Sequence, residues 1–352
     1  EGLSFKALFS FKNYTSSITS RSQSGWNKYS VTSWGKDADG NYEWEITPIG
    51  TPQKPVLNSS FSNSGDRRMY FQTYLDYTRT FGLYSVNGML LFNLDSYSTN
   101  VNSSLISSLP HHKIGYAFRA SYDYNNRYMA EFNAGYNGSE NFAEGHRFGF
   151  FPSFAVGWNV SNESFWEPIS DYISLLKIRA SYGLVGNDQI GADRFIYMSD
   201  LNLTGGNQFR TGYDGRYITL NGPKYIRFQN NEITWEVGRK LNLGVDMQLW
   251  RNLNMAFDFF KERRENIFQK RASIPLYFGT GSTDVYGNYA TVENKGLDLS
   301  VDYGKQISKD FSLQFKGTFT FATNKVLEYD EPMGTRKRVH ATHHHSIQTL
   351  LQ

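Results

Sequence analysis

One cluster of residues in this sequence has the composition of a metal-binding tract. His343, His344 and His345 are consecutive near the C-terminal end, and His340 stands just before them. Histidine-rich tracts of this kind can bind metal ions. No acidic or cysteine residue lies at ligand spacing beside them, however. We therefore predict no metal site here and interpret the tract as a flexible loop or a crystallisation remnant.

Other motifs that could carry chemistry are incomplete. Gly279-Thr280-Gly281 lacks the following glycine and helix of a phosphate-binding loop. The chain has no cysteine, which excludes a disulfide scaffold, a thiolate metal site and a cysteine nucleophile. No Ser/His/Asp order and no pair of carboxylates stands out. We predict that the chain is not an enzyme and uses no cofactor.

Aromatic residues in long polar stretches are better candidates for ligand contact. Ligand sites favour aromatic side chains with a few polar groups, and both sugar rings and peptide side chains can pack on such platforms. Packing of one loop on another is the alternative role for each residue. The predicted substrate-binding residues are Trp26, Trp34, Trp44, Tyr213, Tyr217, Tyr277, Phe278 and Tyr286.

The segments that must position these aromatics alternate apolar and polar residues. Even positions of 114–124 are apolar and odd positions are polar or small, which is the pattern of a strand with one apolar face. Residues 128–136 keep the same even parity. Only a loop with an odd number of residues preserves parity, so we predict a three-residue turn at Asn125-Asn126-Arg127, with an Asn in the left-handed region.

About eleven segments of the chain are predicted strands, because they show this alternation or form a hairpin with a segment that shows it. Long polar stretches separate some of them, and one stretch, residues 13–68, should contain a local hairpin of 29–35 and 42–47. The tail, 326–352, shows no strand pattern. The predicted strands are 3–12, 69–80, 83–94, 114–124, 128–136, 147–158, 172–184, 234–250, 254–261, 288–303 and 311–321.

Strand length and joint length together favour a membrane barrel. Segments of about ten residues match a tilted strand that crosses an outer membrane, and short joints alternate with long ones. Aromatics such as Tyr124, Tyr128 and Trp158 flank the short joints, as an interfacial belt requires. A soluble β-sandwich or propeller is less favoured, because its strands average five or six residues. No transmembrane helix is predicted, and the net charge of +3 is too small to indicate nucleic acid.

The alternation also predicts which residues face lipid and which face the lumen. A lumen can hydrate charged side chains, whereas hydrocarbon cannot. We assign Phe118, Phe132, Val245, Phe257, Leu299 and Phe319 to lipid. The residues assigned to the lumen are Arg119, Glu131, Asp246, Asp258 and Lys316.

Three stretches of the sequence carry motifs that match those of one protein family in order and approximate spacing. The first runs through Asn126-Arg127-Tyr128, Tyr136-Asn137-Gly138-Ser139-Glu140-Asn141-Phe142 and Gly149-Phe150-Phe151-Pro152-Ser153. The second is Leu176-Lys177-Ile178-Arg179-Ala180-Ser181-Tyr182-Gly183, followed by Val185-Gly186-Asn187-Asp188. The third joins Thr234-Trp235-Glu236 and Leu241-Asn242-Leu243-Gly244 to Glu293-Asn294-Lys295-Gly296. Together these stretches resemble the SusC/RagA family of TonB-dependent outer-membrane transporters of Bacteroidetes. We interpret the Asn137–Glu140 and Val185–Asp188 motifs as structural loops rather than ligand sites.

The resemblance implies more than the residues show. It implies a plugged barrel of 22 strands, of which residues 1–352 form a partial TonB-dependent receptor β-barrel domain, without the plug domain and the C-terminal strands. It also implies a place in the bacterial outer membrane, a SusD-like lipoprotein partner, and energy from the TonB-ExbB-ExbD complex through the missing N-terminal part. Active uptake of oligosaccharides or peptides follows. A passive porin, an outer-membrane hydrolase and a soluble β-rich glycan-binding protein are the alternatives.

A partial barrel should expose two edges. We predict an open, curved sheet in which strand 3–12 and strand 311–321 are both edge strands and do not pair with each other. Pairing between them would instead indicate a complete small barrel.

Overall fold

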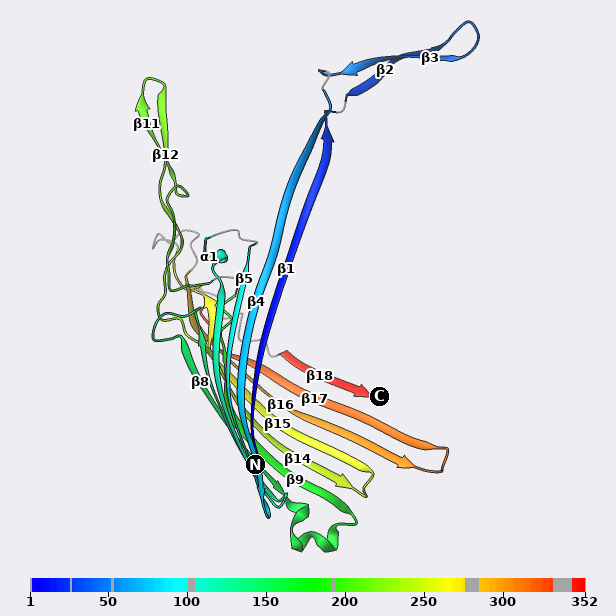
Figure 1. Ribbon diagram of the computed structural model, residues 1–352, viewed down its shortest axis with the longest axis vertical. Coiled ribbons are helices and arrows are strands. Elements are labelled where there is room, and N and C mark those ends of the chain that lie inside the picture. The colour runs from blue at the N-terminus through cyan, green and yellow to red at the C-terminus, as the bar shows by residue number, and fades with distance from the viewer. Residues whose placement is uncertain are drawn as a thin grey trace. The chain divides into compact units, whose positions relative to one another are not determined.

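Most of the chain forms one large β-sheet in this computed structural model. The structure describes residues 2–25, 27–51, 54–100, 105–191, 194–275, 285–331 and 344–351. Twelve strands lie side by side in the order β1-β4-β5-β6-β7-β8-β9-β14-β15-β16-β17-β18 (Figure 1). Their bounds are β1 (Leu3–Ser24), β4 (Val56–Phe81), β5 (Tyr84–Thr99), β6 (His111–Tyr124), β7 (Tyr128–Ser139), β8 (Phe148–Asn159), β9 (Ile173–Asn187), β14 (Glu236–Leu249), β15 (Leu253–Lys270), β16 (Tyr286–Gln306), β17 (Ser312–Glu328) and β18 (His344–Leu351).

The remaining elements lie in the connections between these strands. Three small antiparallel pairs stand apart from the main sheet: β2 (Lys28–Lys36) with β3 (Tyr42–Ile49), β10 (Asp200–Asn202) with β13 (Lys224–Arg227), and β11 (Gln208–Tyr213) with β12 (Arg216–Asn221). The helices are short: α1 (Leu105–Ser108), η1 (Val160–Asn162) and η2 (Ser164–Ile169). No helix of the described chain has the length and apolarity needed to cross a membrane.

The chain divides into two compact units, which we describe separately. The first comprises Glu1–Ser10, Met69–Ser96 and His111–Gln352, and the second comprises Phe11–Arg68 and Tyr97–Pro110. Among the described residues, all buried side chains belong to the first unit. The second unit contains the β2–β3 hairpin, which lies within the residues where the sequence predicts a local hairpin.

The turn between β6 and β7 confirms the prediction from parity. Tyr124 pairs with Tyr128, which leaves three residues in the turn. Both Asn125 and Asn126 adopt positive φ, at 51° and 52°, and Asn tolerates this left-handed region better than most residues. The apolar faces of β6 and β7 therefore stay on the same side of the sheet.

Two strands extend well beyond their predicted ends. The prediction ended the first strand at residue 12, but β1 continues to Ser24, and β4 begins at Val56 rather than at residue 69. The added residues are rich in Ser, Asn and Thr on both faces. Backbone pairing does not require an apolar face, so these residues form strands without producing the period-two signal.

The polar stretches between predicted strands are shorter than predicted, because backbone pairing extends the strands into them without an apolar face. β5 runs to Thr99 and β6 begins at His111, so both extend into the stretch between the predicted strands 83–94 and 114–124. β15 continues to Lys270, beyond the predicted end of strand 254–261. β17 likewise continues to Glu328.

The C-terminal tail contains a strand, contrary to the prediction. β18 pairs antiparallel with β17, from Asn324 opposite His344 to Gly317 opposite Leu351. Strand 311–321 was predicted as an edge, and this pairing makes it internal. Pairing with a neighbour can order a segment whose own sequence has no alternation.

The sheet is open among the residues that the structure describes. Its order begins at β1 and ends at β18, and no pairing joins β1 to β17 or to β18. The predicted open sheet and the predicted edge at β1 are therefore confirmed. The fold class is also confirmed: long antiparallel strands follow one another as a meander, and eleven of them correspond to the eleven predicted strands.

Candidate functional site

The cross-strand register sorts the first unit's sheet into an apolar and a charged face. Directly opposed residues of an antiparallel pair share a face. Val245 lies opposite Phe257, Phe257 opposite Leu299, and Leu299 opposite Phe319. Phe118 and Phe132 share this face, with ring centroids 6.1 Å apart. All six residues that we assigned to lipid thus fall on one side of the sheet.

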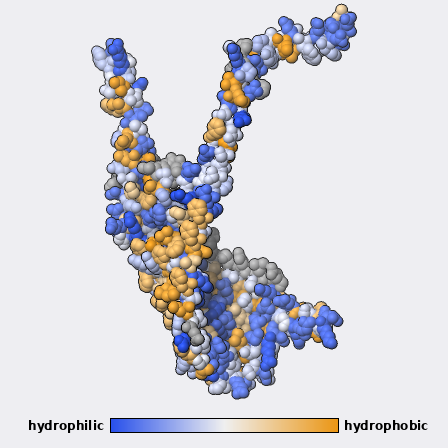
Figure 2. All heavy atoms as spheres, in the orientation of Figure 1, coloured by the Kyte–Doolittle hydropathy of each residue, from blue (hydrophilic) through white to orange (hydrophobic). Residues whose placement is uncertain are grey.

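Aromatic rings continue along this apolar face. The ring centroids of Phe92 and Tyr116 lie 5.1 Å apart, and those of Tyr136 and Phe148 lie 5.0 Å apart. Phe154 is 51% exposed although it lies in the middle of the sheet. Figure 2 shows hydrophobic residues gathered on the surface in this way. A large exposed apolar surface on a folded sheet needs a nonaqueous neighbour.

The opposite face carries charge. Arg179 Nη2 donates to Asp258 Oδ2 at 2.7 Å, and Arg179 Nε donates to Asp246 Oδ2 at 3.1 Å. Farther along the sheet, Arg119 donates to Glu131 at 2.6 Å. The charged residues that the register places on this face include Arg119, Glu131, Lys177, Arg179, Asp246, Asp258, Asp298, Asp302 and Lys316.

Gly244 makes the central ion pairs of the charged face possible. It lies directly opposite Arg179, and a Cβ at this position would stand 2.5 Å from the guanidinium carbon. Any larger residue would push the guanidinium away from Asp246 and Asp258. Sequence reasoning noted this glycine only as part of a motif and missed its role.

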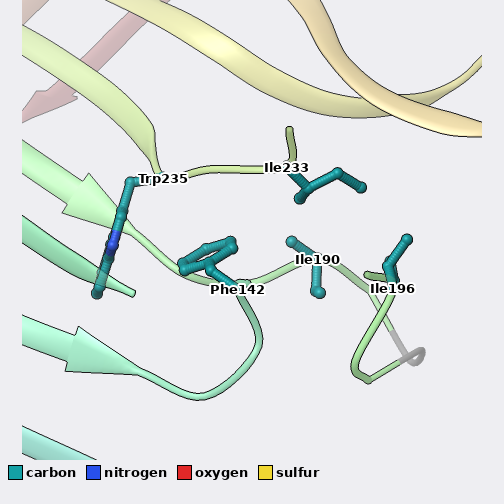
Figure 3. Close-up of a cluster of buried hydrophobic side chains, with 5 residues drawn as sticks. All are labelled: Phe142, Ile190, Ile196, Ile233 and Trp235. Carbon is teal, nitrogen blue, oxygen red and sulfur yellow. The ribbon is translucent and has the colours of Figure 1, made fainter. Parts of the chain in front are cut away.

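A buried core lies beyond the strands, in the loops of the first unit. Phe142 and Ile196 have no exposed surface, Ile233 is 2% exposed, and Ile190 and Trp235 are nearly buried. Figure 3 shows these five side chains converging from two connections: Phe142 comes from β7–β8, and the other four come from β9–β14. The Phe142 and Trp235 ring centroids are 5.3 Å apart. The long loops thus pack as a small hydrophobic core.

A polar latch joins the two motifs that we interpreted as structural loops. The Ser139 hydroxyl donates to Asp188 Oδ2 at 2.9 Å, and the Asn141 side-chain amide donates to the Asp188 backbone carbonyl at 3.2 Å. Lys113 Nζ lies 2.9 Å from the same carboxylate. The motifs therefore hold the β7–β8 loop against the segment after β9, and the structural interpretation fits these contacts.

A second charged cluster supports the latch. Glu140 accepts hydrogen bonds from Arg194 and from the backbone N–H of His112, and the second bond measures 3.1 Å. The Arg194 side chain is only 9% exposed. Burying a guanidinium requires a paired carboxylate, and Glu140 provides it.

The latch predicts a measurable loss of loop stability. Replacing Asp188 with Ala leaves the nearly buried Ser139 hydroxyl without its acceptor and removes the partner of Lys113. We expect the loops to open more easily by about 1–3 kcal/mol, measured as faster hydrogen exchange of residues 139–147 in the whole protein. Asp171→Ala is the control, because the carboxylate of Asp171 is 88% exposed and lies 3.8 Å from Arg251. Equal exchange in both variants would show that the latch contributes nothing.

The short-turn end of the sheet carries the predicted aromatic belt. The ring centroids of Tyr124 and Tyr128 lie 6.3 Å apart. Glu163, in the β8–β9 connection, accepts hydrogen bonds from the Tyr128 hydroxyl at 2.6 Å and from Trp158 Nε1 at 3.2 Å. These donors, joined by the nearby charge of Arg127, hold the pKa of the Glu163 carboxyl below its usual range. Glu163 therefore ties the belt to the turn.

Trp34 and Trp44 are brought together in the second unit. They lie directly opposite each other on β2 and β3, and the Tyr42 and Trp44 rings stack with centroids 6.1 Å apart. A register shift at Thr32 puts Val31 on the same face as Trp34. The two tryptophans are 71% and 64% exposed, so this hairpin presents an aromatic face to its surroundings.

Tyr213 and Tyr217 are separated on their hairpin. Tyr213 pairs with Arg216 and Tyr217 with Gly212, so the two rings point to opposite faces of β11–β12. Tyr213 is 89% exposed, whereas the Arg210 guanidinium covers the Tyr217 ring at 5.4 Å. Only Tyr213 is free of such cover.

Tyr286 packs against the loop core. Its ring stacks on Phe268 with a centroid distance of 5.1 Å and an interplanar angle of 11°, beside the buried cluster. Tyr286 therefore has the packing role that we gave as the alternative to substrate binding. Trp26, Tyr277, Phe278, the Gly279-Thr280-Gly281 motif, His340 and His343 lie outside the described residues.

Metal-binding geometry does not occur among the described residues. The part of the chain that the structure describes contains no group of three or more His, Asp or Glu side chains able to hold an ion. The backbone of His344 and His345 belongs to β18.

Comparison with known proteins supports the barrel interpretation. Residues 3–349 match the family described as TonB dependent receptor-like, beta-barrel. TonB-dependent receptor P39 of Formosa agariphila is 28% identical over 74% of this chain and 22% of its own length. TonB-dependent receptor SusC of Bacteroides thetaiotaomicron is 26% identical over 60% of this chain and 20% of its own length.

A solved structure shows the same fold. The RagAB peptide importer in its closed-closed state aligns with a TM-score of 0.67 and 16% identity, over 94% of this chain and 35% of that chain. The present chain thus spans between a fifth and about a third of the length of these relatives. In such a barrel the apolar face meets lipid and the charged face meets the lumen. The chain belongs to the TonB-dependent receptor β-barrel family of the bacterial outer membrane, and it resembles SusC and RagA.

Proposed function

We propose that this chain is part of the wall of an active importer for oligosaccharides or peptides. The observation that carries the proposal is one continuous sheet with an apolar face and, on its other side, a charged face. Such a sheet separates lipid from a hydrated passage. The relatives are named as TonB-dependent receptors and, for RagAB, as a peptide importer, which supports energised uptake here.

Substrate would first meet the exposed outer aromatics. Trp34 and Trp44 of the second unit, and separately Tyr213 of the first, are largely exposed aromatics of the kind that binds sugar rings and peptide side chains. Tyr217 and Tyr286 contribute less, because Arg210 covers one ring and Phe268 the other. Trp26, Tyr277 and Phe278 remain predictions.

Two partners belong to this proposal. A SusD-like surface lipoprotein would cover the outer opening, and the TonB-ExbB-ExbD complex would supply energy from the periplasmic side. The family assignment and the likeness to SusC and RagA support both partners.

Uptake by the whole transporter tests the function. We expect deletion of TonB or of the neighbouring lipoprotein gene to slow growth on one polymeric glycan or peptide several-fold. Growth that depends on the transporter gene but not on TonB would overturn active import and point to a passive porin.

The aromatic site has its own test. We expect Trp34→Ala combined with Trp44→Ala to reduce ligand affinity and growth on that nutrient several-fold, because both ring faces are lost. Phe165→Ala is the matched control, since this aromatic is 60% exposed but lies in the β8–β9 connection, at the end of the sheet that carries the short turns. A double variant that imports as well as the control would remove these tryptophans from the site.

A further inference from the structure

The apolar face of the first unit is not a smooth surface but contains a groove. The groove has a volume of about 420 Å³ and crosses strands from β1 to β8. None of the side chains that line it is charged. Its principal walls are Leu75, Phe92, Tyr116, Phe118, Tyr136 and Phe150, and Ala134 lies between them.

A small residue among large ones creates this groove. Ala134 lies directly opposite Phe118 on one side and Pro152 on the other, and Phe132 and Tyr136 are its same-face neighbours along the strand. Four bulky side chains therefore surround a single methyl group. The methyl cannot fill the space between them, so a depression remains on an otherwise aromatic surface.

The position of the groove along the strands places it in the outer half of the membrane. The aromatic belt at the short turn includes Tyr124, and Tyr116 lies eight residues farther along β6. A strand tilted by about 40° climbs roughly 2.5 Å per residue along the membrane normal. Tyr116 therefore lies about 20 Å above the belt, within an apolar band about 25 Å tall.

We propose that this groove retains one acyl chain of an outer-leaflet glycolipid. The family's β-barrel places this face in the outer membrane. The groove is uncharged and lies in the outer half of that membrane, so the lipid that fills it comes from the outer leaflet. A saturated chain can follow the depression over Ala134 and contact the rings on both sides by dispersion. The lipid-facing surface of the barrel would thus include a groove that holds one acyl chain.

A second groove on the same face provides an internal control. It has a volume of about 390 Å³, lies nearer the short turns, and is lined by Tyr122, Tyr128, Ala130 and Val156 among others. Phe132 and Phe154, which are directly opposed, form a ridge between the two grooves. A chain in the upper groove is therefore separated from lipid of the inner leaflet.

The test compares one substitution at two positions of β7. Ala134→Phe fills the floor of the upper groove, and Ala130→Phe makes the same change on the same face in the lower groove. Each variant of the whole transporter is purified in mild detergent, and its 3-hydroxy acyl chains, which mark the outer-leaflet glycolipid, are quantified per mole of protein. Heat-modifiable migration on gels verifies that each barrel is folded.

We expect the wild type to retain glycolipid in stoichiometric amount, Ala134→Phe to lose most of it, and Ala130→Phe to keep it. Retention of as much glycolipid by Ala134→Phe as by the wild type would overturn the proposal. Equal loss in both variants, or retention of phospholipid in place of glycolipid, would also overturn it.

Discussion

Arginine in place of Phe132 is expected to lower the free energy of unfolding of the whole protein by about 2–4 kcal/mol. Phe132 is on the apolar face of β7, four residues from the aromatic belt at Tyr128, and is directly opposed by Phe154. That depth is close to the middle of the membrane. A guanidinium there must leave water or distort the bilayer around it. Urea unfolding in lipid vesicles, followed by tryptophan fluorescence, measures the change.

Asn133→Arg is the matched control for Phe132→Arg. Asn133 is the next residue of the same strand, faces the charged side, and donates a hydrogen bond to Glu131 at 2.8 Å. An arginine at this position can use the same carboxylate and stay hydrated, so we expect a change below about 1 kcal/mol. Equal losses in the two variants would contradict the assignment of the two faces.

Removing the Phe142 ring is expected to open the outer loops. Phe142 has no exposed surface, and a buried Phe→Ala substitution costs about 3–5 kcal/mol because it leaves a cavity. The loss should be confined to the loop core that Phe142 forms with Trp235, Ile196 and their neighbours. Hydrogen exchange of residues 188–191 and 194–196 should therefore accelerate strongly, while exchange of the membrane strands stays unchanged.

Phe209→Ala is the control for the loop core. Phe209 is also a loop phenylalanine, but it is 65% exposed on the β11–β12 hairpin. Its truncation creates no cavity and should leave exchange of residues 188–191 and 194–196 unaltered. If Phe142→Ala behaved like Phe209→Ala, the buried cluster would not hold the loops together.

The sequence determined the two faces of the sheet because alternation is a local property. A period of two assigns side chains to opposite faces before any strand finds its partner. Phe118, Arg119 and Phe132 could thus be sorted correctly, and the parity across Asn125 and Asn126 correctly predicted the turn between them. The same alternation supported the choice of a membrane barrel over a soluble sandwich.

Several features had no local signal, and only the tertiary structure decided them. The Ser-rich ends of β1 and β4, and the strand β18, are ordered by pairing with a neighbour rather than by an apolar face. The sequence therefore showed loops where the chain forms strands. Backbone hydrogen bonds carry no signature in the side-chain pattern.

The loop core and its latch are also products of tertiary structure. Phe142 and Trp235 are far apart in the sequence, and so are Ser139 and Asp188, yet each pair is in contact. The sequence marked the motifs around them as structural but could not pair them. It identified Trp34 and Trp44 as candidates, whereas their shared face depends on the register shift at Thr32. Local pattern determines which way a side chain points, and only packing between distant segments decides what it meets.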